Sequence, residues 1–136
     1  MIARHENPLE ARRQAIQATL DAAKSATERN RLGQFATPNA LAIEIARYVQ
    51  SVAGRCLRSV RFADPALGTG SFYSAALAVF GPERIESAVG VELDPGFCDA
   101  ARDLWAEAGL EIVRGDFTRI VAGSGRPARP MSGIIT

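Results

Sequence analysis

The chain has 136 residues, enough for one domain with a single modest hydrophobic core. Hydrophobic residues make up 47% of it and charged residues 23%, a balance that argues against general disorder. The formal net charge of +1 argues against a strongly basic nucleic-acid surface on this chain alone. No apolar run is long enough to predict a membrane helix, and no signal peptide is present. We therefore expect a cytoplasmic globular domain with no membrane association.

Cysteine and histidine chemistry has little support in the sequence. Cys56 and Cys98 are far apart and show neither metal-ligand spacing nor a disulfide framework. The single histidine, His5, lies near the amino terminus with no plausible catalytic partner. The sequence therefore predicts no metal site and no catalytic pair built on these residue types.

The amino-terminal stretch carries the signals of a helix. Asn7 is a suitable cap, Pro8 favours the first helical position, and Glu10 is placed to close a capping box. A narrow apolar stripe follows at helical spacing, formed by Leu9, Ile16, Leu20 and Ala23. Basic side chains occupy the rest of the helix, namely Arg12, Arg13, Lys24 (the only lysine in the chain), Arg29 and Arg31. We interpret them as a solvated face, with direct DNA contact as the alternative. The stripe itself needs a partner in this domain or in another chain.

A second helix is predicted after Gly33, which can end the first one. Thr37 is placed to cap this second helix, with Pro38 in its first turn. Apolar residues then recur at helical spacing until Gly54, namely Leu41, Ile45, Tyr48 and Val52. This pattern is typical of an amphipathic helix.

A strand, a tight turn and a helix are predicted next. Residues 59–63 are partly β-branched, as in a buried strand, and a proline at position 65 ends it. Gly68 and Gly70 allow backbone torsions that a Cβ would forbid, and an apolar helix begins at Gly70. A helix that starts after such a turn directs its free N–H groups at whatever lies over the turn. The stretch therefore predicts a ligand site.

Two more strands are predicted, with an acidic residue at the end of the first and just after the end of the second. Residues 87–92 form the second strand, parallel to the first because a helix separates them, and Glu92 lies at its carboxyl end. A nucleotide-binding sheet places there an acid that accepts hydrogen bonds from ribose hydroxyls, although an isolated glutamate could simply be exposed. Residues 110–113 form the third strand, followed by Asp116, which could also cap the segment after it.

The helix between the second and third strands begins at Asp94 and Pro95, with a core face of Phe97, Ala101, Leu104, Trp105 and Ala108. A loop at 118–130 and a fourth strand at 131–136 complete the chain.

The order and spacing of these motifs resemble those of S-adenosylmethionine-dependent DNA methyltransferases of the N6-adenine class, as found in restriction–modification systems. The resemblance rests on Leu-Gly-Gln-Phe-x-Thr-Pro at 32–38, Asp-Pro-Ala-Leu-Gly-Thr-Gly-Ser-Phe at 64–72, Glu-Leu-Asp-Pro at 92–95 and Gly-Asp-Phe at 115–117. The family usually has a small residue or cysteine where this chain has Leu67. The dinucleotide fingerprint fits less well, because Tyr73 stands where that fingerprint requires its third glycine.

The resemblance implies an α/β fold, namely a partial Rossmann-like S-adenosylmethionine-dependent methyltransferase fold with a parallel sheet. A helical segment (1–32) would precede the cofactor-binding domain (33–136). The implied cofactor is S-adenosyl-L-methionine. The residues implied to bind it are Phe35, Thr37, Pro38, Asp64, Pro65, Ala66, Gly68, Gly70, Phe72, Glu92, Leu93, Asp116 and Phe117. Within this set the Thr37 segment would hold the methionine carboxylate and Glu92 the ribose. Asp116 would accept from the adenine amino group, with Phe117 stacking nearby.

The resemblance covers only the cofactor half of such an enzyme. In the family an Asn/Asp-Pro-Pro-aromatic motif after the fourth strand binds the extruded adenine, and no such run occurs in these 136 residues. We therefore expect the S-adenosylmethionine-binding portion of an adenine-specific DNA methyltransferase that is inactive alone. Its catalytic motif, target-recognition domain and DNA contacts would come from a continuation of the chain or from a partner chain. The alternative is a non-catalytic, truncated cofactor-binding or interaction module. A nicotinamide-dependent oxidoreductase is disfavoured by Tyr73.

Overall fold

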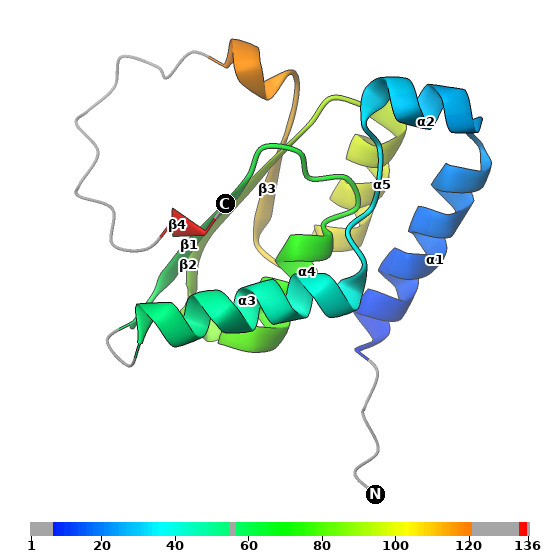
Figure 1. Ribbon diagram of the computed structural model, residues 1–136. Helices are drawn as coiled ribbons and strands as arrows, with labels where there is room; N and C mark the ends of the chain where they lie inside the picture. Colours follow the sequence, from blue (N-terminus) through cyan, green and yellow to red (C-terminus); the bar gives the residue numbers. More distant parts are fainter. Residues whose placement is uncertain (1–6, 55–56, 121–133, 136) are drawn as a thin grey trace, which may run out of the picture.

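The computed structural model describes residues 7–54, 57–120 and 134–135, which form a mixed α/β fold around a small parallel sheet (Figure 1). The strands are β1 (Val60–Asp64), β2 (Ile85–Glu92), β3 (Leu110–Arg114) and the two-residue β4 (Ile134–Ile135). Their order across the sheet is β3-β2-β1-β4, and every pairing is parallel. No helix in this part of the chain combines the length and the apolar character needed to cross a membrane.

Two crossovers connect the three longer strands. Helix α4 (Ser71–Phe80) and a short 3₁₀ helix (Pro82–Arg84) join β1 to β2, and α5 (Pro95–Trp105) joins β2 to β3. The register pairs Asp64 with Gly90 and Glu92 with Arg114, so the carboxyl ends of all three strands lie at one edge of the sheet. The three predicted strands are confirmed with small shifts at their ends. Of the predicted fourth strand and the loop before it, residues 121–133 and 136 lie outside the described residues, as do His5 and Cys56.

The amino-terminal segment is two helices, whereas the sequence pattern predicted one. Helix α1 (Pro8–Ala22) and α2 (Ala26–Leu32) are separated by a break at residues 23–25, and Ser25 caps α2 in a capping box with Glu28. Asn7 caps α1 as expected, since its side chain accepts from the backbone N–H of Leu9 at 3.0 Å. The predicted capping box at Glu10 is wrong, because the Glu10 carboxylate binds other side chains in the interior.

Helix α1 lies beside α5 and also contacts α4 (Figure 1), so the partner for its apolar stripe is this domain. The prediction of a solvated basic face is confirmed for Arg12 and Arg31, which are exposed. It is wrong for Arg13, whose exposed fraction is 3%, and for Lys24, which forms a partly buried ion pair with Asp94. A buried guanidinium is tolerated only where it is paired, and Arg13 is paired with Glu10.

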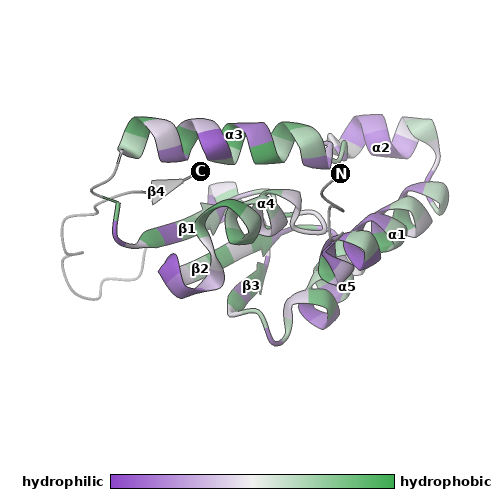
Figure 2. Cartoon of the chain, turned by 90° about the horizontal axis from the view of Figure 1, so that it is seen from below, coloured by the Kyte–Doolittle hydropathy of each residue, from purple (hydrophilic) through white to green (hydrophobic). Residues whose placement is uncertain are grey.

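Helix α3 (Asn39–Ala53) is confirmed, but its buried face is not the predicted one. The helix packs along α4 through Ala42 and Ala46, small residues that let the two helices approach closely (Figure 2). The predicted stripe of Leu41, Ile45, Tyr48 and Val52 is exposed instead. Thr37 does not cap this helix either: Pro38 occupies the cap position, with no side-chain hydrogen bond.

The aromatic core locks α4 and α5 onto the sheet. Tyr73 packs between Phe62 and Trp105, with ring centroids 5.3 Å and 5.2 Å away. The Tyr73 hydroxyl donates to the carbonyl of Ala108, and the indole Nε1 of Trp105 donates to the carbonyl of Thr69 at 2.9 Å. The prediction that Trp105 is a core residue is therefore confirmed. Its indole also fixes the backbone of the turn between β1 and α4.

Gly70 is required by this packing. Its φ of +88° lies in the region that favours glycine, and a Cβ there would lie 2.5 Å from Nε1 of Trp105. We predict that Gly70→Ala lowers the free energy of unfolding by about 3 kcal/mol, from backbone strain and overpacking together. The control is Gly33→Ala, at a φ of +63° with nothing within 4 Å of the added Cβ, which should cost only about 1 kcal/mol. Chemical denaturation measures both losses, and equal losses would contradict the packing argument.

Candidate functional site

A pocket of about 730 Å³ lies at the carboxyl ends of β1, β2 and β3. Its volume falls within the range of about 300–1,000 Å³ that is typical of small-molecule sites. Most of its lining comes from the turn after β1, the loop after β2, the turn after β3 and residues 33–37, which we call the strap. Helix α1 contributes Gln17. Parallel strands linked by helices bring these segments together although they are far apart in the sequence.

The pocket collects most of the residues that the sequence singled out. Those that line it are Phe35, Thr37, Asp64, Pro65, Ala66, Gly68, Phe72, Glu92, Leu93, Asp116 and Phe117. Pro38 and Gly70 do not line it. Pro38 is the cap residue before α3, and Gly70 serves the contact with Trp105. The strap therefore contributes to the site through the residues before Pro38.

Three carboxylates mark the strand ends, and Glu92 ties two of the loops together. Its Oε2 accepts from the backbone N–H of Gly68 at 2.7 Å, and its Oε1 accepts from the N–H of Asp94 at 2.8 Å. Each carboxylate oxygen has a second lone pair, so Glu92 can still accept hydrogen bonds from a ligand. The turn after β1 is thus held against the end of β2 by a charged acceptor.

Asp64, at the carboxyl end of β1, is a second acidic side chain that lines the pocket. Burial raises the pKa of Asp64, the hydrogen bond from the Ala66 N–H at 3.0 Å lowers it in part, and the charge of Glu92 raises it further. Two acidic side chains near one another favour a ligand that brings hydrogen-bond donors or a positive charge.

Asp116 caps the segment that follows it, which was the alternative role predicted from its position in the sequence. Its Oδ1 accepts from both the N–H and the hydroxyl of Thr118, at 3.0 and 2.6 Å, and these bonds lower its pKa. Its Oδ2 lies 3.4 Å from Nε of Arg119. The side chain therefore caps the short 3₁₀ helix Phe117–Arg119. Its role toward an adenine amino group stays a prediction.

The mouth of the pocket is apolar. Phe35, Leu93 and Phe117 all line it and are 69%, 59% and 55% exposed. They come from the strap, from the loop after β2 and from the turn after β3. Exposed apolar side chains that rim a concave site are typical of binding surfaces for a flat or apolar group.

A buried polar network behind the pocket, which sequence reasoning missed, joins α1 to the turn after β1. Nη1 of Arg13 donates to the Thr69 hydroxyl at 2.9 Å, and that hydroxyl donates to Oε1 of Gln17 at 2.8 Å. The guanidinium also holds Glu10 through two bonds of 2.8 Å, and Ser74 donates to the same carboxylate at 2.5 Å. The available signal was the helical spacing of Glu10, Arg13 and Gln17, which places three polar side chains on one face of α1.

The charge state of this network follows from its contacts. Burial alone would raise the pKa of Glu10, but the hydrogen bonds from Arg13, Ser74 and Gln14 together bring it below its usual value. Glu10 therefore stays ionised and neutralises the buried guanidinium, which in turn can orient the Thr69 hydroxyl.

The comparison with known protein families adds no assignment. None of the family models against which the chain was scanned matches it.

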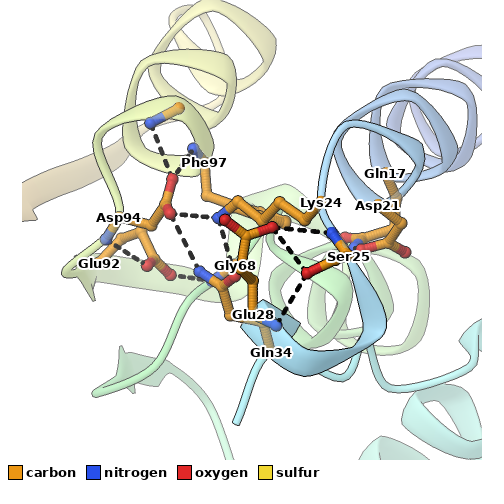
Figure 3. Close-up of polar contacts among 11 residues, drawn as sticks. Gln17, Asp21, Lys24, Ser25, Glu28, Gln34, Gly68, Glu92, Asp94 and Phe97 are labelled. Atoms are coloured by element: carbon orange, nitrogen blue, oxygen red, sulfur yellow. Dashed lines mark hydrogen bonds and ion pairs between the residues drawn. The ribbon is translucent and has the colours of Figure 1, made fainter. Parts of the chain in front are cut away.

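Asp94 joins the loop after β2 to the break between α1 and α2, to α5 and to the strap (Figure 3). Its Oδ1 caps α5 by accepting from the N–H groups of Gly96 and Phe97, at 2.9 and 3.1 Å. Its Oδ2 accepts from Nζ of Lys24 and from Nε2 of Gln34. Burial would raise the pKa of Asp94, but these bonds together with the charge of Lys24 lower it to about 2.

This pKa predicts a pH dependence of stability. The folded-state pKa lies below the unfolded value, so the unfolded chain binds more protons and stability is lost as pH falls from about 4 toward 2. Asp94→Asn keeps a capping oxygen but loses the charge. It should lower the free energy of unfolding at pH 7 by about 2 kcal/mol, with the difference from the parent shrinking below pH 4.

The control for this prediction is Asp99→Asn in the same helix, whose ion pair with Arg102 is exposed at 3.7 Å. It should cost less than about 0.5 kcal/mol at any pH. Denaturant titrations between pH 2.5 and 7 measure both variants. A loss for Asp94→Asn that does not change with pH would count against the charge as its cause.

Proposed function

We propose that this chain binds S-adenosyl-L-methionine as the cofactor-binding portion of an N6-adenine DNA methyltransferase. The observation that carries the proposal is the convergence of four sequence-distant segments on one pocket, namely the strap, the glycine turn, the Glu92 loop and the Asp116 turn. These are the four segments on which the resemblance to the methyltransferase family rests. Nothing in the amino-acid composition requires these four segments, which are far apart in the sequence, to lie at one pocket.

The side chains at the pocket fit the chemistry of this cofactor. Glu92 can accept from ribose hydroxyls, and the apolar faces of Leu93 and Phe117 suit an adenine ring. Asp64 suits the methionine ammonium, while the strap at Thr37 and the first N–H groups of α4 suit the methionine carboxylate. When bound, S-adenosylmethionine supplies an activated methyl group. The chain's own residues bind and orient it and screen it from water.

The strand order supports the same proposal. The order β3-β2-β1-β4 matches the first four strands of the doubly wound nucleotide-binding arrangement. In such sheets the order of the strands reverses between β1 and β4, because later strands are added on the other side of β1. Ligands bind beyond the carboxyl ends of the strands near that point. We accordingly propose a Rossmann-like methyltransferase fold, of which these strands are the first part.

The packing of Tyr73 favours this cofactor over a nicotinamide dinucleotide. In the dinucleotide fingerprint the third glycine permits close packing of the helix on the strand. Here Tyr73 stands at that position and fills the space between α4 and Phe62 of β1. A nicotinamide-dependent oxidoreductase is therefore the weaker candidate.

Binding of the cofactor tests the proposal directly. In calorimetric titrations we predict that the chain binds S-adenosylmethionine more tightly than NAD. Glu92→Ala should weaken the first interaction by about 1.5–3 kcal/mol, the scale of a charge-assisted hydrogen bond. Glu107→Ala changes an exposed glutamate outside the pocket and should leave affinity unchanged.

Because Glu92 also holds the Gly68 amide, thermal melts of each ligand-free variant should accompany the titrations. A variant that stays folded and loses affinity supports the ribose assignment. Equal affinity for S-adenosylmethionine in Glu92→Ala and the parent would refute that assignment, and no binding by the parent at millimolar cofactor would refute the proposed function.

Methyl transfer should need more than these residues. The 136 residues contain no Asn-Pro-Pro or Asp-Pro-Pro run to hold an extruded adenine. We predict that the isolated chain, incubated with tritium-labelled S-adenosylmethionine and adenine-containing duplexes, leaves the DNA unlabelled. A continuation of the chain or a partner chain carrying that motif should confer labelling. Detection of N6-methyladenine with the pure chain alone would contradict this expectation.

A further inference from the structure

Lys24, which lies outside every motif of the proposed function, meets the strap and the loop after β2 at the break between α1 and α2. Its Nζ donates to Oε1 of Gln34 at 2.8 Å and forms an ion pair with Asp94. The same ammonium lies 4.8 Å from the centroid of the Phe97 ring, within the range of a cation–π contact. Figure 3 shows Lys24, Gln34 and Asp94 pointing toward one another from three different segments.

Gln34 uses both ends of its amide in this cluster. Oε1 accepts from Lys24, and Nε2 donates to Oδ2 of Asp94 at 3.1 Å. An amide held at both its oxygen and its nitrogen has one orientation and cannot rotate without breaking a bond. The cluster therefore fixes the strap at Gln34, beside Phe35 and before Thr37.

The rest of the strap has few other attachments. Toward α2 its backbone is held by the N–H groups of Gly33 and Gln34, which donate to the carbonyls of Asn30 and Arg29 at 3.3 and 3.0 Å, and the Phe35 N–H donates to the Gly33 carbonyl at 3.0 Å. At its other end the Thr37 carbonyl accepts from the Ser71 hydroxyl at 2.7 Å. Between these points Phe35 and Ala36 are exposed and line the pocket. A segment with few buried contacts is held mainly by its end points.

We propose that Lys24 is a positioning residue that holds the strap over the pocket through Gln34 and Asp94, and so sets how long a bound ligand stays. This inference rests on the proposed function for the identity of the ligand. Lys24 itself does not line the pocket. Its effect reaches the site along two routes, through Gln34 to the strap and through Asp94 to Glu92, whose Oε1 accepts from the Asp94 N–H.

Lys24→Met tests the proposal, because it keeps the length of the side chain but removes the charge and the donors. Hydrogen–deuterium exchange of the ligand-free chain should become faster at Gln34 and Phe35, whose amides donate hydrogen bonds, while β1 and β2 stay protected. Lys24→Arg keeps the cation and should restore most of the protection. The control is Arg12→Met, which removes an exposed positive charge from α1.

Dissociation of the cofactor provides the second measurement. Trp105 is the only tryptophan and donates to Thr69 in the turn that lines the pocket, so its fluorescence can follow stopped-flow release of S-adenosylmethionine. Lys24→Met should raise the dissociation rate on the order of tenfold, the scale of losing a partly buried charged hydrogen bond, with little change in the association rate. A merely structural role would not separate the two rates in this way.

The outcomes separate this inference from the proposed function. Unchanged exchange at Gln34 and Phe35 in Lys24→Met would overturn the positioning role whether or not the cofactor binds. Faster exchange with an unchanged dissociation rate would overturn the claim that the strap retains the ligand. If the parent chain does not bind S-adenosylmethionine, the proposed function fails, while the exchange measurement still decides whether Lys24 holds the strap.

Discussion

The contact between Arg13 of α1 and the hydroxyl of Thr69 is the interaction on which the shape of the candidate site depends. A guanidinium this deeply buried is costly unless its charge and its donors are satisfied, and Glu10 and Thr69 satisfy them. Thr69 in turn is held by Gln17 and, through its carbonyl, by Trp105. The turn after β1 is therefore fixed from behind by α1 and α5, which leaves its front face open toward the pocket. The amino-terminal helix is part of the site's support.

The pocket combines acidic side chains at the strand ends with exposed apolar side chains at its rim. Asp64 and Glu92 lie at adjacent strand ends because β1 and β2 are parallel. The register shift between these strands lies at the start of β1, between Val60 and Arg61, and so leaves their carboxyl ends aligned. The exposed rings of Phe35 and Phe117 lie on segments that the sheet does not itself constrain, so their positions depend on local contacts such as the Gln34 amide and the Asp116 cap. Such a combination suits a ligand with polar hydroxyl and ammonium groups at one end and a flat ring at the other.

Much of this arrangement can be predicted from the sequence, namely those parts whose conformation is determined by a short stretch of neighbouring residues. A short, partly β-branched stretch followed by Pro65, and glycines before an apolar helix, suffice to place the strand and the turn. Glu92 follows from the rule that parallel strands present their carboxyl ends at one edge. The break before α2 was also accessible, since Ser25 and Glu28 have the spacing of a capping box that propensity alone overlooks.

The misplaced features are those in which tertiary packing selects among local options. Helix α3 has two candidate faces, and the close approach of α4 selects the one with Ala42 and Ala46 over the larger residues at 41, 45, 48 and 52. From the sequence Arg13 is expected at the surface, because arginine is usually solvated. In the structure it is buried and paired with Glu10 and Thr69. The spacing of Glu10, Arg13 and Gln17 groups these polar side chains on one face of α1, but it does not show that this face is buried.

The most direct test of the account is to map the amide resonances of the ¹⁵N-labelled chain during titration with S-adenosylmethionine. Glycine amides occupy a separate region of the spectrum and sample both the pocket and distant places in the fold. Cofactor bound in the pocket should shift the resonances of Gly33, Gly68 and Gly115, which line it, and leave those of Gly54 and Gly81, which do not, unchanged. Shifts confined to Gly54 and Gly81, or no shifts at saturating cofactor, would contradict the claim that this pocket is the cofactor site.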